Sequence, residues 1–335
     1  MRREMEAAPM KLPHRRHFLH LAAGAAALPA ASRFAWAQAY PTRSVRIIAA
    51  TGPGGAPDIL ARLLGQWLSE RLGQQFVTEN RPGGGNTIGT EVVVRAPPDG
   101  YTLLLVDGTA SINATLYEKL NYNFIRDIAT VAGIVRLPNL MMVNPSVPAK
   151  TVPEFIAYAK ANPGKINMAS PGIATPGHVA GELFKMMTGI EMVHVPYRGG
   201  APALTGLIGG QVQVMFLSPV ASIEYIRSGR LRALAVTTTT RWEGLPDIPT
   251  VGEFVPGYET SIVLGVGVPK ATPVEIIDKL NREINAALAD PKIKERLAVL
   301  GGTPLAGSPA DFAKLIAEET EKWGKVIKFA GIKPE

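Results

Sequence analysis

The sequence predicts an α/β protein of two domains, built from parallel βαβ units. Strand-like and helix-like segments alternate along the chain, which is the pattern typical of such units. Glycine-rich loops repeatedly join a strand to the helix that follows it. The chain has 335 residues, of which 46% are hydrophobic and 19% charged, and this is the composition of a globular protein large enough for two domains.

The first unit of the chain contains an amphipathic helix between strands. Apolar residues from Ile59 to Leu68 recur at i, i+3 and i+4, which places them on one face of a helix, and Gly73 ends it. The strands predicted around this helix are Val45–Ala49, Phe76-Val77 and residues 101–106.

The middle of the chain repeats this order. Helices are expected to begin at Thr151, where Glu154 completes a capping box, and at Thr175, which precedes a proline in the first turn. The strands predicted here are residues 140–143, 166–169, 192–195, 212–217 and 231–236.

The last part of the chain is predicted to be helical. A capping box at Thr272 begins one helix, which ends at Asp290-Pro291. A second helix runs to about Leu300, and a third, capped by Ser308, runs to about Phe329. Three helices in succession without a strand are expected to pack onto a sheet formed earlier in the chain.

Residues 1–39 have the features of an export signal. A basic segment precedes an alanine-rich apolar stretch at residues 19–31, and small residues then allow cleavage near Ala37 or Ala39. The stretch is too short to span a membrane, which takes roughly 20 apolar residues. The pair Arg15-Arg16 favours the twin-arginine route over the general secretory route. The sequence therefore predicts an exported, periplasmic protein.

Charge and composition exclude several classes of function. The net charge is +7, but residues 1–39 contribute +4, from six Lys/Arg and two Asp/Glu, which leaves +3 for residues 40–335. No basic cluster remains there, so no nucleic-acid partner is expected. The absence of cysteine excludes disulfides and thiolate metal sites. His178 and His194 lack the spacing of metal ligands, so no metal is expected. No cofactor is expected either.

Three loops of similar design form the candidate site. Each follows a strand, is rich in glycine, serine or threonine, and begins a helix. In open α/β sheets, ligands bind at the carboxyl ends of the strands, where such loops converge. A helix N-terminus carries roughly +0.5 charge, so these loops together predict a site for an anion, most simply a carboxylate. The loops are residues 52–58, 170–175 and 197–202.

The roles of individual side chains in these loops stay open at this point. Asp58 either stabilises the helix dipole or orients a polar group of the ligand. Arg198 either bonds the anion or holds its own loop through backbone carbonyls. His178 fits a structural role at a helix start better than a catalytic one. The P-loop and nucleophile-elbow motifs are absent, and Pro57 and Ile88 stand where the dinucleotide fingerprint needs glycine.

With these residues in place, the chain resembles the exported solute-binding proteins of tripartite tricarboxylate transporters, the TctC or Bug family. The resemblance covers nearly the whole chain after the signal. It implies a type II periplasmic-binding-protein fold, in which two doubly wound α/β lobes are joined by two crossing strands. Lobe I would comprise residues 40–140 and 262–335, and lobe II residues 141–261. The stretches that carry it are PGGAPDILAR, ENRPGGGNTIGT, PDGYTLL, NATLY, TPGHVAGELF, VPYRGGAPAL, GGQVQVMF and GRLRALAVT.

The resemblance also implies a ligand and its contacts. The ligand would be a small carboxylate: a dicarboxylate, a tricarboxylate, an acidic amino acid or an aromatic acid. Backbone amides of the first two loops would hold its carboxylate. Two departures make the pocket less aromatic than is usual in the family: Ala50-Thr51-Gly52 replaces a bulky residue, and residues 261–265 read SIVLG. The candidate ligand-binding residues are Gly54, Gly55, Ala56, Asp58, Thr109, Ser111, Ser170, Ile173, Ala174, Thr175, His178, Arg198 and Ser218.

The expected function is capture of the carboxylate between the lobes by a monomer, followed by delivery to the membrane permease subunits of a tripartite transporter. No catalytic residue is predicted. Two alternatives stay open. An orphan binding protein would present its ligand-bound form to a sensor instead. An exported hydrolase would use Ser170 or Ser218 with His178, although no third member of a triad lies near them in the sequence.

Overall fold

The computed structural model describes residues 40–117 and 119–334. The predicted export signal, residues 1–39, lies outside the described residues. Within the part that is described, no helix is long and apolar enough to cross a membrane.

The first sheet has six strands in the order β11-β4-β10-β3-β1-β2. Strand β1 pairs in parallel with β2 and β3, which confirms the βαβ pairing predicted for the start of the chain. Strand β10 comes from late in the sequence and runs antiparallel between β3 and β4. The strands are β1 (Val45–Ala49), β2 (Phe76–Asn80), β3 (Thr102–Val106), β4 (Ile128–Pro138), β10 (Ser261–Pro269) and β11 (Thr303–Pro304).

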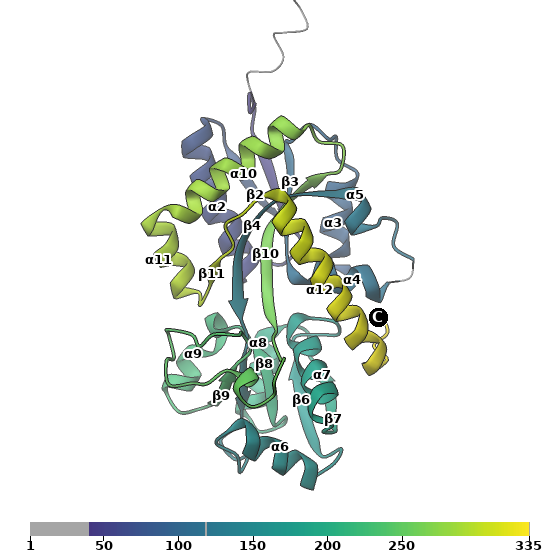
Figure 1. Ribbon diagram of the computed structural model, residues 1–335, viewed down its shortest axis with the longest axis vertical. Helices are drawn as coiled ribbons and strands as arrows, with labels where there is room; N and C mark the ends of the chain where they lie inside the picture. Colours follow the sequence, from purple (N-terminus) through teal and green to yellow (C-terminus); the bar gives the residue numbers. More distant parts are fainter. Residues whose placement is uncertain (1–39, 118, 335) are drawn as a thin grey trace, which may run out of the picture. The chain divides into compact units, whose positions relative to one another are not determined.

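Helices from both ends of the chain pack against the first sheet (Figure 1). Helix α2 ends at Gly73, whose left-handed backbone confirms the predicted helix stop. The helices are α2 (Ala56–Leu72), α3 (Thr87–Val94), α4 (Gly108–Leu116), α5 (Phe124–Asp127), α10 (Val274–Ala289), α11 (Pro291–Val299) and α12 (Pro309–Ala330), with a 3₁₀ turn, η2, at Gly84–Asn86.

The second sheet has five strands in the order β7-β6-β8-β5-β9. Strand β6 runs parallel to β7 and β8, whereas β5 runs antiparallel to β8 and β9. The strands are β5 (Leu140–Val143), β6 (Ile166–Ser170), β7 (Met192–Pro196), β8 (Val214–Leu217) and β9 (Arg232–Val236). The helices are α6 (Val152–Ala161), α7 (Pro176–Thr188), α8 (Gly200–Ile208) and α9 (Pro219–Arg227), with a 3₁₀ turn, η3, at Val251–Glu253.

The chain passes between the sheets at two buried crossings that are bonded to each other. Asn139 alone separates β4 from β5, and its N–H donates to the Thr237 hydroxyl (2.9 Å). The same hydroxyl donates to the carbonyl of Thr260 (2.7 Å), which lies just before β10. Thr237 therefore connects the outgoing and the returning segments.

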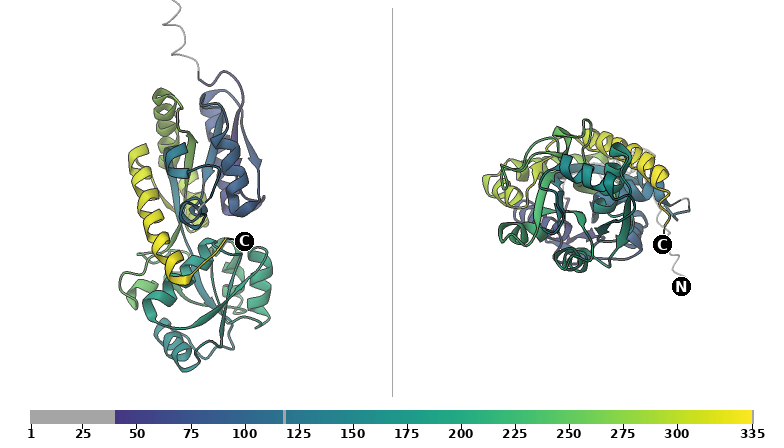
Figure 2. Two further views of the ribbon diagram at one scale, coloured as in Figure 1. Left: turned by 90° about the vertical axis from the view of Figure 1, so that its right-hand side faces the viewer. Right: turned by 90° about the horizontal axis from the view of Figure 1, so that it is seen from below.

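Helix α12 contacts elements of both lobes. It packs on β4 and α4 and also on α7, and its distal residues Trp323, Val326 and Ile327 are buried in the core of the second lobe. The yellow helix can be followed from one sheet toward the other in Figure 2. An ion-pair cluster holds it at the returning crossing, because Lys322 Nζ lies 3.1 Å from Glu259 Oε2 and 2.6 Å from Glu319 Oε1.

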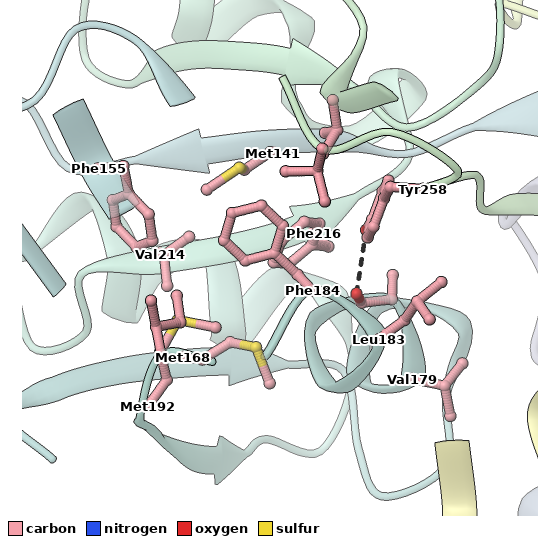
Figure 3. Close-up of a cluster of buried hydrophobic side chains, with 14 of the residues drawn as sticks. Met141, Phe155, Met168, Val179, Leu183, Phe184, Met192, Val214, Phe216 and Tyr258 are labelled. Atoms are coloured by element: carbon pink, nitrogen blue, oxygen red, sulfur yellow. Dashed lines mark hydrogen bonds between the residues drawn. The ribbon is translucent and has the colours of Figure 1, made fainter. Parts of the chain in front are cut away.

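The core of the second lobe is built around aromatic rings (Figure 3). The Phe184 ring on α7 lies 6.0 Å from that of Phe216 and 6.3 Å from that of Phe155. It meets Tyr258 edge to face at 5.9 Å, and the Tyr258 hydroxyl donates to the carbonyl of Ala180 (3.0 Å). This cluster fixes α7 against the sheet, and the start of α7 belongs to the candidate site.

Several local predictions about helix starts were wrong in detail. Thr272 does not cap α10: the helix begins after Pro273, and the Thr272 hydroxyl donates to the carbonyl of Pro269 instead. Thr151 does cap α6, but Glu154 accepts from the N–H of Lys150 rather than from that of the cap residue. The capped start of α12 is confirmed. A short strand, β11, lies between α11 and α12.

Candidate ligand-binding site

The first loop is held from within by the carboxylate of Asp58. This side chain is 4% exposed and accepts the N–H of Gly54 (2.9 Å), the amide of Asn80 (3.0 Å) and an ion pair from Arg62 (2.9 Å). Burial alone would raise the pKa of Asp58, but these hydrogen bonds hold that pKa below its usual value. Asp58 therefore shapes the loop, and the N–H of Gly54 points at Asp58 rather than outward. Gly55 and Ala56 follow at the start of α2.

The second loop is held by a network around Ser170, which is fully buried. Its hydroxyl donates to the carbonyl of Gly172 (2.9 Å) and lies 2.6 Å from His194 Nε2. The Thr175 hydroxyl also donates to the carbonyl of Gly172 (2.8 Å). Thr175 stands at the cap position of α7, as predicted, but its side chain makes no capping hydrogen bond.

Two histidines form a stacked pair beneath this loop. The rings of His178 and His194 lie 3.5 Å apart and nearly parallel, at 9°. His178 Nδ1 accepts the N–H of Ala174 (3.0 Å), and its Nε2 lies 3.6 Å from Glu182 Oε1. The alternative that paired Ser170 with His178 is therefore wrong about the base, because the ring beside the Ser170 hydroxyl is that of His194.

The pairing predicts a pH dependence of stability. Burial and the adjacent His178 ring lower the pKa of His194 to about 3, from an ordinary value of 6.5. The unfolded chain therefore binds a proton that the folded protein does not bind, and stability falls as the pH drops from about 6.5 toward 3. Between pH 6.5 and 5 we expect a loss of about 1 kcal/mol, reduced from the full linkage value by partial solvent exposure.

Urea unfolding at several pH values would measure this loss. The control is His194→Gln, whose side chain can still bond the Ser170 hydroxyl but does not titrate. The difference in unfolding free energy between the two proteins should change between pH 7 and 5. A difference that stays constant over that range would contradict the assignment.

The third loop is joined to the second through backbone bonds. The N–H of Tyr197 donates to the carbonyl of Ser170 (3.0 Å), and that of Gly199 donates to the carbonyl of Pro171 (2.9 Å). The Arg198 side chain is exposed and makes no hydrogen bond or ion pair with the residues that the structure describes. Arg198 therefore does not hold its loop through carbonyls, which was one of its two predicted roles, and its guanidinium is free to meet an anion.

The first lobe contributes the start of α4. Asp107 caps this helix by accepting the N–H of Thr109 (3.0 Å), and it also accepts the amide of Asn86 (2.7 Å). Burial raises the pKa of the Asp107 carboxyl.

The hydroxyls of Ser111 and Ser218 are buried and have no hydrogen-bond partner among the described residues.

A cavity of about 120 Å³ brings residues of both lobes together. Thr109 and Asn86 line it from the first lobe, and Ile173, Ala174 and Thr175 line it from the second. Larger hollows of about 470 and 420 Å³ lie elsewhere and contain none of the candidate residues. The small cavity is not lined by the other candidate residues, which are Gly54, Gly55, Ala56, Asp58, Ser111, Ser170, His178, Arg198 and Ser218.

Some residues of the site were missed by sequence reasoning. Asn86 and Asn113 hold the turn at the wall of the cavity, since Asn113 donates to the carbonyl of Gly85 (2.6 Å) and Asn86 donates to Asp107 (2.7 Å). Pro334, from the end of the chain, lines the same cavity. The run GGGN was visible in the sequence, and all four of its residues have positive φ, as such a turn requires. No local signal indicated Pro334, because its place depends on the course of α12.

The N-termini of several helices place partial positive charge near the candidate loops. Helices α2, α7 and α8 begin at Gly55, Thr175 and Gly199 without a side-chain cap, whereas α4 is capped by Asp107. The first N–H groups of an uncapped helix have no partner within the helix and attract anions. Thr175, at the cap position of α7, lines the cavity, so the N-terminus of this helix lies at the cavity wall.

Two α/β lobes joined by two buried crossings, with a cavity lined by residues of both lobes, form the architecture of a periplasmic binding protein of the type II class. The family model "Tripartite tricarboxylate transporter family receptor", TctC, matches residues 60–332. This chain belongs to that family, whose members are receptors rather than enzymes.

Relatives with solved structures cover most of the chain. An R. palustris protein solved with adipate is 38% identical, with a TM-score of 0.81, over 88% of this chain and 100% of that one. MatC from Rhodopseudomonas palustris, solved with bound malate, is 30% identical, with a TM-score of 0.75, over 86% of this chain and 100% of that one. A relative found by sequence comparison, Protein BugT of Bordetella pertussis, is 35% identical over 300 residues, which are 89% of this chain and 92% of that protein.

Proposed function

We propose that this chain binds a small dicarboxylate, of the size of malate or adipate, between its lobes and delivers it to the permease of a tripartite transporter. The observation that carries this proposal is the uncapped start of α7, whose cap residue Thr175 lines a cavity that Thr109 lines from the other lobe. The relatives solved with adipate and with malate support the same ligand class.

The proposed binding mode uses three kinds of donor. One carboxylate would accept N–H groups from the first turn of α7, where Gly177 and His178 have no partner within the helix. The exposed guanidinium of Arg198 would add a charge-assisted bond. The Thr109 hydroxyl would bond from the other lobe. A ligand that touches both lobes favours the closed arrangement by its difference in affinity for the two states.

Asp58 and His178 would act in this mode on the loops and not on the ligand. Gly55 and Ala56, at the uncapped start of α2, would meet the far carboxylate once the lobes close. We also propose export to the periplasm with cleavage near residue 37 or 39, and a monomer as the working form.

A thermal-shift screen of residues 40–335 against malate, adipate and the diamide of adipate tests the ligand class. Prior unfolding and refolding removes any co-purified ligand. A ligand at about 100 times its Kd should add about 2.7 kcal/mol, which raises the melting temperature by several degrees. The diamide should give no shift. If no carboxylate shifts the melting temperature, the proposed ligand class is wrong.

Arg198→Ala refines the test. Loss of one charge-assisted bond at a partly exposed site should weaken binding of the carboxylate about tenfold, as measured by calorimetry. The matched control is Arg230→Ala, which removes another exposed arginine from the same lobe and should leave the Kd unchanged. Equal effects of the two variants would remove Arg198 from the site.

A further inference from the structure

Ala174, in the wall of the cavity, has an unusual backbone conformation. Its φ is +57°, and Ala174 and Asn86 are the only non-glycine residues with positive φ in the described part of the chain. An alanine in this region crowds its Cβ against the following carbonyl, so the conformation persists only where neighbouring contacts enforce it. Ala174 is 3% exposed and lies between Ile173 and Thr175, which line the cavity with it.

The ring of His178 contacts the backbone of Ala174. The N–H of Ala174 donates to His178 Nδ1 (3.0 Å), and His178 is itself 4% exposed. Because Nδ1 accepts, the proton of the neutral ring is on Nε2, which faces Glu182 Oε1 (3.6 Å). Lys185 pairs with the other oxygen of Glu182 (2.8 Å), and the His194 ring lies flat against that of His178. The imidazole is thus fixed in tautomer and in plane.

We propose that His178 is a positioning residue for ligand binding: by accepting the N–H of Ala174 at Nδ1, it holds Ala174 left-handed and so sets the cavity wall from Ile173 to Thr175. The inference rests on the proposed function, since the wall is where the ligand would bind. It also changes the role of the Ala174 N–H, which is directed at His178 and does not hold the carboxylate.

Two substitutions separate this role from simple packing. In His178→Asn, the side-chain Oδ1 stands at the same number of bonds from the backbone as Nδ1 and can accept the same N–H. In His178→Leu, the volume is largely kept but the acceptor is lost. Adding Ala174→Gly to His178→Leu removes the steric cost of positive φ, so the wall no longer needs the acceptor to the same extent.

Amide hydrogen exchange of the ligand-free proteins tests the hydrogen bond without reference to any ligand. The Ala174 amide should be protected in the wild type and in His178→Asn, and should exchange at least tenfold faster in His178→Leu. Circular dichroism shows whether each variant is folded. Equal protection in His178→Leu and the wild type overturns the inference, as does loss of protection in His178→Asn when that variant is folded.

Calorimetry with adipate and malate then tests the consequence for binding. We expect a Kd about tenfold weaker in His178→Leu, close to the wild type in His178→Asn, and partly restored in the double variant. If the folded His178→Leu variant loses protection of the Ala174 amide but binds the acids with the wild-type Kd, the positioning role is wrong. If the wild type binds neither acid, the proposed function fails, while the exchange result still decides whether His178 sets the loop.

Discussion

Replacement of Phe184 by alanine should lower the free energy of unfolding by about 4 kcal/mol. The ring is fully buried and lies within 6.3 Å of three other aromatic rings, centroid to centroid. The loss combines the transfer free energy of the buried ring with the cost of the cavity that remains, because Phe155, Phe216 and Tyr258 come from separate elements and cannot all move inward.

Urea unfolding of both proteins at pH 7 measures this difference. The control is Phe329→Ala, in which the ring is 56% exposed near the end of α12 and the change should stay within about 0.5 kcal/mol. A loss below about 1.5 kcal/mol for Phe184→Ala would show that the second core repacks far more freely than a close-packed interior does.

Gly177→Ala should affect both stability and ligand binding. A Cβ at this position would lie 2.3 Å from the carbonyl oxygen of Phe216, which is backbone of β8 and cannot rotate away. The first turn of α7 must therefore move away from the sheet, at a cost of about 3 kcal/mol. Because the same turn would supply the N–H donors for a carboxylate, the affinity should fall at least tenfold.

A matched glycine at another helix start provides the control. In Gly200→Ala, at the first position of α8, the nearest heavy atom to the new Cβ would be Leu217 Cδ1 at 3.6 Å, an ordinary contact. Unfolding and calorimetry should show little change there. Similar results for the two alanines would mean that α7 is not pressed against β8 as closely as the distance indicates.

The parts of the fold that could be predicted depend on local chemistry. Gly73 ends α2 because the required left-handed turn lies at that residue, and Ser308 with Asp311 caps α12 within one turn. Strands of the first βαβ unit follow from short apolar runs. Thr272 shows the limit of such reasoning, because a nearby carbonyl, that of Pro269, competes for its hydroxyl.

What could not be predicted depends on residues far apart in the chain. Strand β4 has no clear alternation and is stabilised by β10, more than 120 residues later. The partner of Ser170 is His194, 24 positions away, and only the pairing of β6 with β7 brings them together. The arrangement of two lobes joined by two crossing strands was expected from the family resemblance and not from local sequence patterns. The lobe boundaries and the ligand-binding set stay predictions.

The course of α12 has a consequence for how the chain is made. The ribosome synthesises this helix after every element that it joins, and its residues Trp323, Val326 and Ile327 complete the core of the second lobe. Neither lobe can therefore reach its final packing while α12 is still unmade, although domains often fold in order during synthesis. Folding of this protein should therefore be completed only after α12 has been synthesised, so a chain cut before Trp323 should lack the final packing of both lobes.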